Sequence, residues 1–114
     1  MDCIFCKISE GKIKSEKIYE NDNFFSIPDA NQKVPGHSLV ISKKHFKTVL
    51  DLPQTLGGEL LDCIKKTTLI LIDKYQATGF NVVQNNFADA GQVVNHIHYH
   101  ILLRKKGDGK PVCY

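Results

Sequence analysis

Apolar residues in the first half of the chain come in short runs that are separated by turn-forming residues. These runs predict a helical turn followed by three short strands, over residues 3–10, 17–20, 24–27 and 38–41. Gly11 ends the helical turn, the cluster Asn21-Asp22-Asn23 turns the chain between two strands, and Pro28 ends the second strand. The polar stretch that closes with Pro35-Gly36 predicts a loop before the third strand.

The second half of the chain contains the strongest helical pattern. A helix is expected from Pro53 to about Tyr75, because its apolar residues follow one helical stripe and the segment is too long for one strand. Strands are expected over residues 80–85 and 94–104, with a loop through Ala90-Gly91 between them. The order of strands, long helix and strands predicts an α+β fold with a mostly antiparallel sheet.

Length and composition narrow the class of protein. A chain of 114 residues is expected to form one domain over residues 1–114, and its 42% hydrophobic and 24% charged residues exclude a disordered or low-complexity chain. The longest apolar run, Leu69 to Ile72, is far too short to cross a membrane, and the N-terminus shows no secretory signal. We therefore expect a cytoplasmic protein without a membrane partner.

The charge balance is only mildly basic. Lys and Arg number 15 against 12 Asp and Glu, which gives a net charge of +3, and the isoelectric point is about 8.7. The basic residues are scattered, and the triplet Arg104-Lys105-Lys106 is typical of a solvated surface. We expect no nucleic-acid partner, because such proteins usually carry a basic stripe. A small anionic ligand remains compatible with this charge.

Three of the five histidines alternate along seven residues, at His96, His98 and His100. Alternate side chains of a strand share a face, so the three imidazoles are expected to point the same way. The intervening residues are expected on the other face, and they are Ile97, Tyr99 and Ile101. Incidental surface histidines and a zinc site of three imidazoles are the alternatives. The upstream loop, residues 85–94, is rich in small and amide residues, which can turn backbone N–H groups toward an anion.

The four cysteines are expected to be reduced thiols in a cytoplasmic protein. Cys3 and Cys6 form a C-x-x-C pair. This spacing is compatible with two buried free thiols, a metal site or a redox pair. A redox pair is disfavoured because no thioredoxin-type βαβ pattern surrounds it. Cys63 lies in the apolar helical stripe and is expected in the core, whereas Cys113 lies near the end of the chain.

Three stretches together resemble the histidine triad (HIT) superfamily, and in particular its Hint-like branch of purine nucleotide-binding hydrolases. They are Cys3 to Ile8, Pro35 to His45, and the motif from Ala90 to Leu102 that contains the alternating histidines. The resemblance covers nearly the whole chain, from Cys3 to about Leu103. It implies a five-stranded antiparallel sheet with one long helix and a short N-terminal helix. It also implies a homodimer in which two such sheets pair into one of ten strands.

The same resemblance implies a hydrolase that cleaves purine nucleoside phosphoramidates or adenylylated compounds through a nucleotidyl-histidine intermediate. His98 matches the nucleophile, which suits an imidazole that is neutral near pH 7. His100 matches the residue that contacts the phosphate and assists the leaving group. His37 matches a histidine behind the triad, whose first member is His96. The alternative is a non-catalytic HIT module that binds a nucleotide or a partner protein.

The expected ligand is a purine nucleoside monophosphate or phosphoramidate. Asn85, Gln92 and the backbone at Val93 match a phosphate cradle, and neutral donors there stabilise developing charge. Asp29 matches a ribose-binding acid. The purine slot is matched by apolar residues that could equally be plain core, namely Phe5, Ile8, Ile13, Ala30 and Leu39. Two features depart from the pattern: Val93 stands where many relatives carry Ser or Thr, and residues 105–114 have no clear match.

The resemblance also implies a structural zinc ion. Some relatives bind zinc through a matching cysteine pair and two histidines, which here correspond to Cys3, Cys6, His45 and His96. Two thiolates and two imidazoles form the closed tetrahedral set that is typical of structural zinc. A role for His96 as a ligand would remove it from the phosphate chemistry.

Overall fold

The structure is a computed structural model that describes residues 3–110. Its helices are α1 (Ile4–Ser9) and α2 (Gly57–Tyr75), with two 3-10 turns, η1 (Gln54–Leu56) and η2 (Ala88–Ala90). The strands are β1 (Tyr19–Glu20), β2 (Phe24–Pro28), β3 (Ser38–Ser42), β4 (Gly79–Val83) and β5 (His98–Arg104). These elements confirm the predicted order of strands, long helix and strands.

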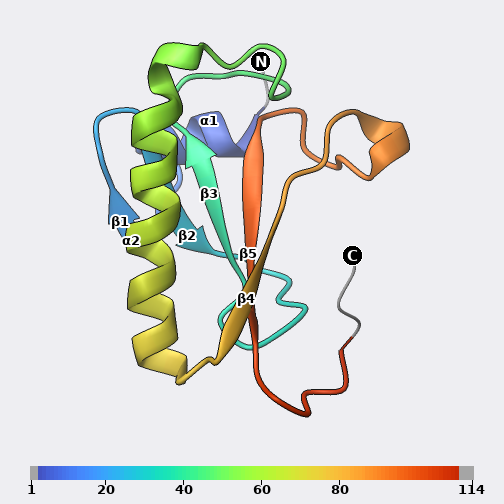
Figure 1. The fold of residues 1–114 in the computed structure, drawn as a ribbon. Coiled ribbons are helices and arrows are strands. Elements are labelled where there is room, and N and C mark those ends of the chain that lie inside the picture. The colour runs from blue at the N-terminus through green and yellow to red at the C-terminus, as the bar shows by residue number, and fades with distance from the viewer. Residues whose placement is uncertain (1–2, 111–114) are drawn as a thin grey trace.

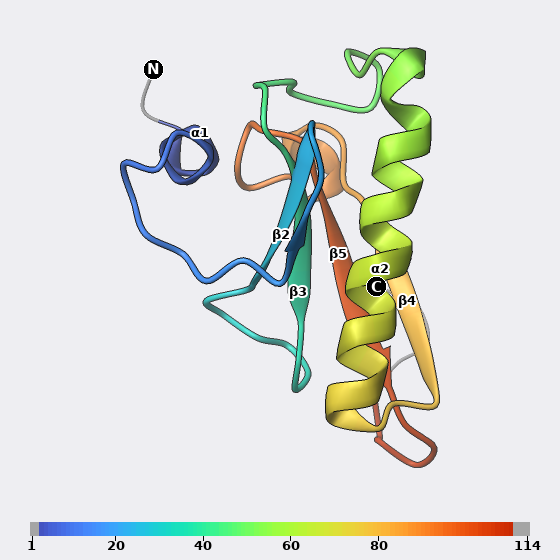
Figure 2. The same cartoon turned by 90° about the vertical axis from the view of Figure 1, so that its left-hand side faces the viewer.

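The five strands form one antiparallel sheet in the order β1-β2-β3-β5-β4. Figures 1 and 2 show the long helix α2 along one face of the sheet and the short helix α1 on the other face. The chain therefore has the predicted α+β architecture. Strands β3 and β5, which are far apart in the sequence, lie side by side in the middle of the sheet.

Each face of the sheet packs its own hydrophobic cluster. Side chains of β2 and β3 alternate between the faces, so Phe25 and Ile41 pack with α1, whereas Phe24 and Val40 pack with α2. Cys63 is fully buried in the cluster under α2, as the sequence predicts. No helix among residues 3–110 is long and apolar enough to cross a membrane.

Helix α2 has boundaries that local chemistry explains. Pro53 has an extended backbone and lies immediately before η1, which leads directly into α2. The helix ends at Tyr75 and is capped by Gln76, which has a left-handed backbone with φ of 55° and donates its N–H to the Ile72 carbonyl oxygen. Tyr19 and Asn21 hold the helix against β1, because both donate hydrogen bonds to the Asp62 carboxylate, at 2.6 and 3.1 Å.

The strands are shorter than the sequence predicts at three ends. The first strand begins at Tyr19 rather than at residue 17, and β4 ends at Val83 rather than at residue 85. The last strand begins at His98 rather than at residue 94. Before β5, a hydrogen bond to a loop replaces strand pairing, since the N–H of Ile97 donates to the carbonyl oxygen of Phe46 at 2.6 Å.

The turn before β3 requires a glycine. Gly36 has a φ of +84°, and a Cβ there would lie 2.8 Å from Leu103 Cδ1 and 2.9 Å from Tyr75 Cδ2. A side chain at this position would therefore combine backbone strain with close contacts. Gly11 has a similar φ of +78° but no atom within 4 Å of the equivalent position.

We expect Gly36→Ala to lower the free energy of unfolding by about 2–4 kcal/mol, as strain and overpacking add. Gly11→Ala is the matched control and should cost only the strain, about 1 kcal/mol. Urea unfolding of both variants measures the difference. Equal losses for the two variants would show that the contacts with Leu103 and Tyr75 do not matter.

Candidate active site

Strand β5 presents two of the three alternating histidines on the α1 face of the sheet. His98 pairs with Ile41 and His100 pairs with Leu39 on β3, and paired residues of an antiparallel sheet share a face. The residues between them pack under α2, as Tyr99 and Ile101 show. The predicted alternation is confirmed for these positions.

His96 lies in the bend before β5 rather than in the strand. Its ring nevertheless lies on the α1 side, because the Phe5 ring packs edge-on against both His96 and His98, at centroid distances of 5.7 and 5.1 Å. Phe5 comes from the first turn of α1, so this helix covers two of the histidines directly.

The imidazole of His98 is oriented by a backbone carbonyl. Its Nδ1 lies 2.7 Å from the His96 carbonyl oxygen, which can only accept a hydrogen bond. Nδ1 therefore carries the proton, and Nε2 keeps a lone pair. His98 is 8% exposed and lines a pocket, so this lone pair belongs to a ring that a ligand can reach.

His100 and His37 form a hydrogen-bonded chain behind the pocket. The N–H of Lys33 donates to His37 Nδ1 at 3.2 Å, so His37 Nε2 carries the proton. That nitrogen lies 2.9 Å from His100 Nδ1. His100 Nδ1 is then the acceptor, and its Nε2 carries a proton. The Asp29 carboxylate lies 3.4 Å from His37 Nε2 and adds a second acceptor.

Both of these imidazoles are neutral near pH 7. Burial lowers the pKa of His37, and Asp29 only partly opposes that shift. Burial, together with the rings of His98 and His37, lowers the pKa of His100 to about 4. Ligand atoms of Asp29, His37 and His100 also lie within 4.8 Å of one another. A metal ion there would need a lone pair on His37 Nε2, so the Lys33 N–H favours the hydrogen-bonded chain.

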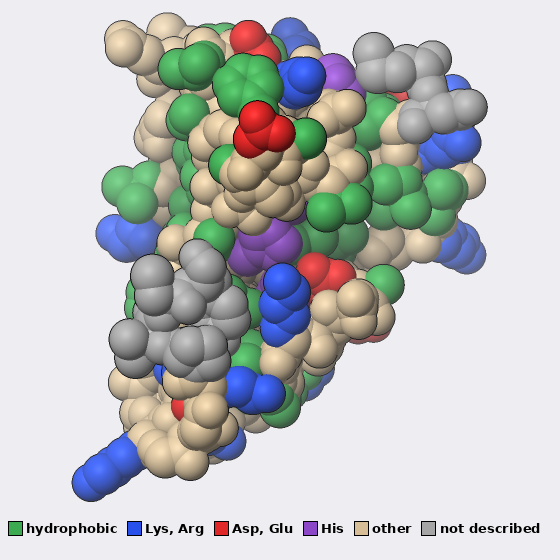
Figure 3. Space-filling view, turned by 90° about the vertical axis from the view of Figure 1, so that its right-hand side faces the viewer, with side chains coloured by type: hydrophobic (Ala, Val, Ile, Leu, Met, Phe, Trp, Pro, Cys, Tyr) green, Lys and Arg blue, Asp and Glu red, His purple; other side chains and the backbone are tan. Residues whose placement is uncertain are grey.

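A pocket of about 510 Å³ opens beside these histidines, between α1, the loop after β2 and the loop before β5. Figure 3 shows a histidine side chain at the bottom of a hollow, with an acidic and a basic side chain next to it. Its apolar wall includes four residues predicted for the purine slot, Phe5, Ile8, Ala30 and Leu39. The fifth, Ile13, is 39% exposed and is not part of the lining.

The structure divides the predicted phosphate and ribose residues into two groups. Asp29, Asn85 and Val93 line the pocket, together with Gly91. Gln92 does not line it, because its side chain is 5% exposed and is hydrogen-bonded to two backbone segments. Pocket residues that the sequence did not assign to the site are Ile4, Lys14, Ser15, Ile27, Pro28, Asn31, Lys33 and Val94. Ile4 and Val94 lie in stretches that resemble the HIT family, but the other six lie outside those stretches, so only the tertiary structure places them at the pocket.

The four predicted metal ligands meet beneath α1. Cys3 Sγ lies 3.3 Å from His96 Nδ1, and Cys6 Sγ lies 3.3 Å from His45 Nδ1. All four ligand atoms lie within 4.8 Å of one another. His96 Nε2 lies 2.7 Å from the Ser42 carbonyl oxygen, which leaves the lone pair of His96 on Nδ1. These residues therefore fit a tetrahedral metal site of two sulfurs and two nitrogens.

The electrostatics of this cluster also fit a cation. Burial lowers the pKa of His96 to about 4, so the ring is neutral and able to bind a metal. Burial, with the neighbouring Cys3 thiol, raises the pKa of Cys6 to about 11. A bound cation would reverse that direction, because it stabilises the thiolate. Cys113 lies outside the described residues.

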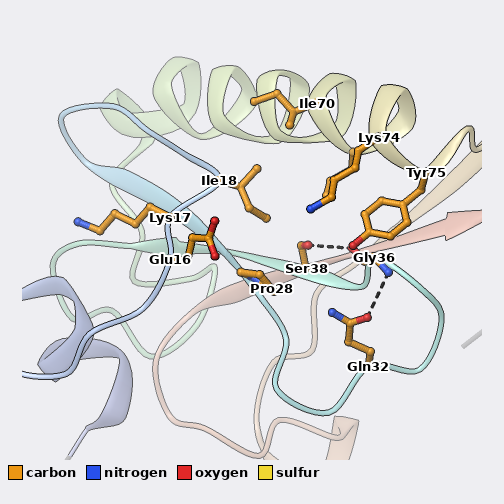
Figure 4. Close-up of a pocket in the computed structure, with 11 residues that line it drawn as sticks. Glu16, Lys17, Ile18, Pro28, Gln32, Gly36, Ser38, Ile70, Lys74 and Tyr75 are labelled. Atoms are coloured by element: carbon orange, nitrogen blue, oxygen red, sulfur yellow. Dashed lines mark hydrogen bonds between the residues drawn. The ribbon is translucent and has the colours of Figure 1, made fainter.

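A second hollow lies between α2 and the loops near β1 and β3 (Figure 4). Three of its lining residues are already bonded to one another within the turn before β3: Ser38 Oγ donates to the Gly36 carbonyl oxygen at 2.8 Å, and the Gly36 N–H donates to Gln32 Oε1 at 3.2 Å. Its lining contains neither histidine nor cysteine. The histidine-lined pocket is therefore the better candidate site.

The HIT domain family model matches residues 10–107 of this chain. An uncharacterised HIT-like protein of Methanocaldococcus jannaschii is 41% identical over 112 residues, which cover 98% of this chain and 86% of that protein. An adenosine 5'-monophosphoramidase of Candida albicans is 36% identical, over 90% of this chain and 70% of that protein. An adenylylsulfatase of Arabidopsis thaliana is also 36% identical, over 94% of this chain but only 54% of that protein.

Solved structures agree with this similarity. The crystal structure of a HIT family member from Bacillus subtilis has a TM-score of 0.90 at 36% identity, over 100% of this chain and 82% of that one. A histidine triad nucleotide-binding protein from Candida albicans has a TM-score of 0.80 at 35% identity, over 91% of this chain and 76% of that one. The fold and the pocket define an α+β protein with imidazoles on a central strand. The chain belongs to the HIT family.

We expect the His100 imidazole to titrate near pH 4 rather than near 6.5, because burial and two neighbouring rings lower its pKa. A histidine of the unfolded chain binds its proton near pH 6.5. As pH falls from 6.5 to 4 the unfolded state therefore gains this proton first, and His100 destabilises the fold. An NMR titration of the ring protons, with His100→Asn to identify the resonance, measures the pKa. A midpoint near 6.5 would contradict the burial argument.

Proposed function

We propose that this protein is a purine nucleotide-binding hydrolase that cleaves nucleoside phosphoramidates or adenylylated compounds. The observation that carries the proposal is the hydrogen bond from His98 Nδ1 to the His96 carbonyl oxygen, at 2.7 Å. It makes Nε2 the nucleophilic nitrogen of a ring that lines the pocket. The phosphoramidase and adenylylsulfatase names of two relatives support the same class of substrate.

In the proposed reaction, the His98 Nε2 lone pair forms a bond to the α-phosphorus. The bond from phosphorus to the leaving group breaks, and the leaving group departs with the electron pair and a proton taken from water. His100 Nε2–H donates a hydrogen bond to a phosphoryl oxygen as its charge increases, because the chain through His37 leaves that proton on Nε2. A second water then attacks phosphorus and gives a proton to the hydroxide that the first water left, and the electron pair of the N–P bond returns to His98.

The rest of the pocket suits the two ends of a nucleotide. We propose that the Asp29 carboxylate binds the ribose hydroxyls and that Phe5, Ile8, Ala30 and Leu39 hold the base, since these side chains line the pocket. Asn85, Gly91 and the backbone at Val93 also line the pocket and suit the phosphate. Val93 is 90% exposed and offers no side-chain donor to the leaving group.

We expect His98→Ala to lower AMP release from adenosine 5'-phosphoramidate by at least about 10³-fold, since the nucleophile is lost. AMP affinity should change by less than about 3-fold, because the pocket walls come from other residues. Chromatography of the products and calorimetry measure the two quantities. Tyr99→Phe, on the opposite face of the same strand, is the matched control and should keep the activity of the native chain.

A loss of AMP affinity as large as the loss of rate would contradict this division of roles. If the native chain binds AMP but releases none from the phosphoramidate, the protein is a nucleotide-binding module and the proposed hydrolysis is wrong.

We propose that the cluster of Cys3, Cys6, His45 and His96 binds one structural zinc ion. The distances between donor atoms and the neutral state of His96 support this proposal. When bound, the ion would supply a cross-link between α1 and the segments that carry the two histidines, and no chemistry on the substrate. Through its Nδ1, His96 would then hold the metal while its carbonyl oxygen orients His98.

Protein purified without chelators should contain about one zinc per chain. Cys3→Ser should remove it and lower the melting temperature by about 10 °C, if the lost ligand costs about 2 kcal/mol. Cys63→Ala is the control: it removes a buried thiol under α2 and should leave the metal content unchanged. Little metal in the native chain and an unchanged melting temperature for Cys3→Ser would favour two free thiols instead.

We also propose that the chain is one domain that pairs with a second copy. Strand β4 is an edge of the sheet, and it exposes Phe80 and Val82 by 46% and 43%. These residues pair with Leu103 and Ile101, which face α2, and α2 itself exposes Leu61 and Leu69. Figure 2 shows α2 and β4 along the same side of the molecule. An apolar helix beside an unpaired edge suits the union of two sheets.

We expect a dimeric mass at micromolar concentration, which light scattering measures. Val82→Lys should shift the mass toward the monomer, because the new charge would be buried between the two copies. A monomeric mass for the native chain would refute the pairing.

A further inference from the structure

Two segments far apart in the sequence are joined by hydrogen bonds, and one of the two lines the pocket. We call residues 45–49 the rim segment and residues 85–93 the pocket loop. The Gln92 side chain donates from Nε2 to the Lys47 carbonyl oxygen at 2.6 Å. The Val49 N–H donates to Asn86 Oδ1 at 2.9 Å. The pocket loop is therefore fixed to the rim segment at two points.

Gln92 also closes the pocket loop on itself. Its Oε1 accepts the Phe87 N–H at 2.7 Å, and its own N–H donates to the Phe87 carbonyl oxygen at 3.1 Å. The side chain is 5% exposed and does not line the pocket. Both ends of its amide are thus engaged by the backbone.

Phe87 needs such support because its backbone conformation is unusual. Its φ is 69° and its ψ is 157°, a combination that residues with a side chain rarely adopt. Only surrounding contacts keep a residue in such a conformation. Gln92 engages both the N–H and the carbonyl of Phe87, so it is the residue best placed to hold it.

The part of the loop that Gln92 shapes is the part that meets the ligand. Gly91 and Val93 flank Gln92 and line the pocket, and the Asn85 amide lies next to Gly91, since a Cβ there would be 3.6 Å from Asn85 Nδ2. Neutral donors stabilise an anion well only when they are held in place beforehand. The Gln92 bonds hold the backbone on both sides of these donors.

We propose that Gln92 is a positioning residue that shapes the phosphate-binding part of the pocket loop without contacting the phosphate. This proposal rests on the proposed function, because the proposed function assigns the phosphate to the pocket loop. It also changes the role that the sequence suggested for Gln92, from a ligand of the phosphate to a residue that acts through Phe87 and Lys47. The recognition of the nucleoside does not involve Gln92.

The test uses Gln92→Ala and Gln92→Met in the full chain. Methionine keeps the length and much of the buried volume of glutamine but removes both amide bonds, so it serves if the alanine variant does not fold. Gln54→Ala is the matched control, because it removes the same amide from an exposed position in η1. Amide hydrogen exchange of the ligand-free chain and the affinities for AMP and adenosine are measured for each variant.

We expect faster exchange confined to the pocket loop and the rim segment, before any ligand is added. AMP affinity should fall by about 10-fold, adenosine affinity should change by less than 2-fold, and kcat should fall more than KM rises. Gln54→Ala should behave as the native chain does in every measurement.

Weaker AMP binding without faster exchange in the ligand-free loop would overturn the proposal, because Gln92 would then contact the phosphate directly. Equal losses of AMP and adenosine affinity would also overturn it, because the role would be general stability. Failure of the native chain to bind AMP would contradict the proposed function. In that case the exchange data would still decide whether Gln92 holds the loop.

Discussion

The register between β3 and β5 is the constraint on which the site depends. Because His98 and His100 pair with Ile41 and Leu39, both imidazoles lie on the α1 face and the intervening residues pack under α2. A shift of one residue would bury the imidazoles beneath the long helix and move its apolar contacts to the pocket. The two hydrophobic clusters prevent that shift, since each one recruits alternate residues of the same central strands. The same strand register therefore determines both the packing of the core and the geometry of the site.

Backbone groups then decide what each buried imidazole can do. The carbonyl oxygens of Ser42 and His96 fix the proton on His96 Nε2 and on His98 Nδ1. An N–H group, that of Lys33, fixes the tautomer of His37. Burial lowers the pKa values of His37 and His96 and keeps these two rings neutral, and a neutral imidazole is the form that binds a metal. Side-chain identity alone would leave every one of these tautomers undecided.

The group of Cys3, Cys6, His45 and His96 shares several elements with the pocket. Helix α1 supplies Cys6 to this group, and it supplies Phe5 and Ile8 to the pocket. A helix of six residues has little stability of its own, so its packing against β2 and β3 must hold it in place. The segment after His45 continues into the rim segment, which is bonded to the pocket loop through Gln92. The proposed zinc would thus stabilise the same segments that shape the proposed nucleotide site.

The sequence alone determined the order of elements, the alternation of His98 and His100, and the likeness of the chain to the HIT family, because these follow from local pattern and motif. The start of β5 and the placing of His96 could not be predicted, since bonds from Ile97 to Phe46 and from His96 to Ser42 join distant segments. The same holds for Gln92 and Ile13, whose residue types suit a ligand site. Only the tertiary structure decides whether such a side chain faces the pocket, the backbone or solvent, because that choice depends on which loops meet.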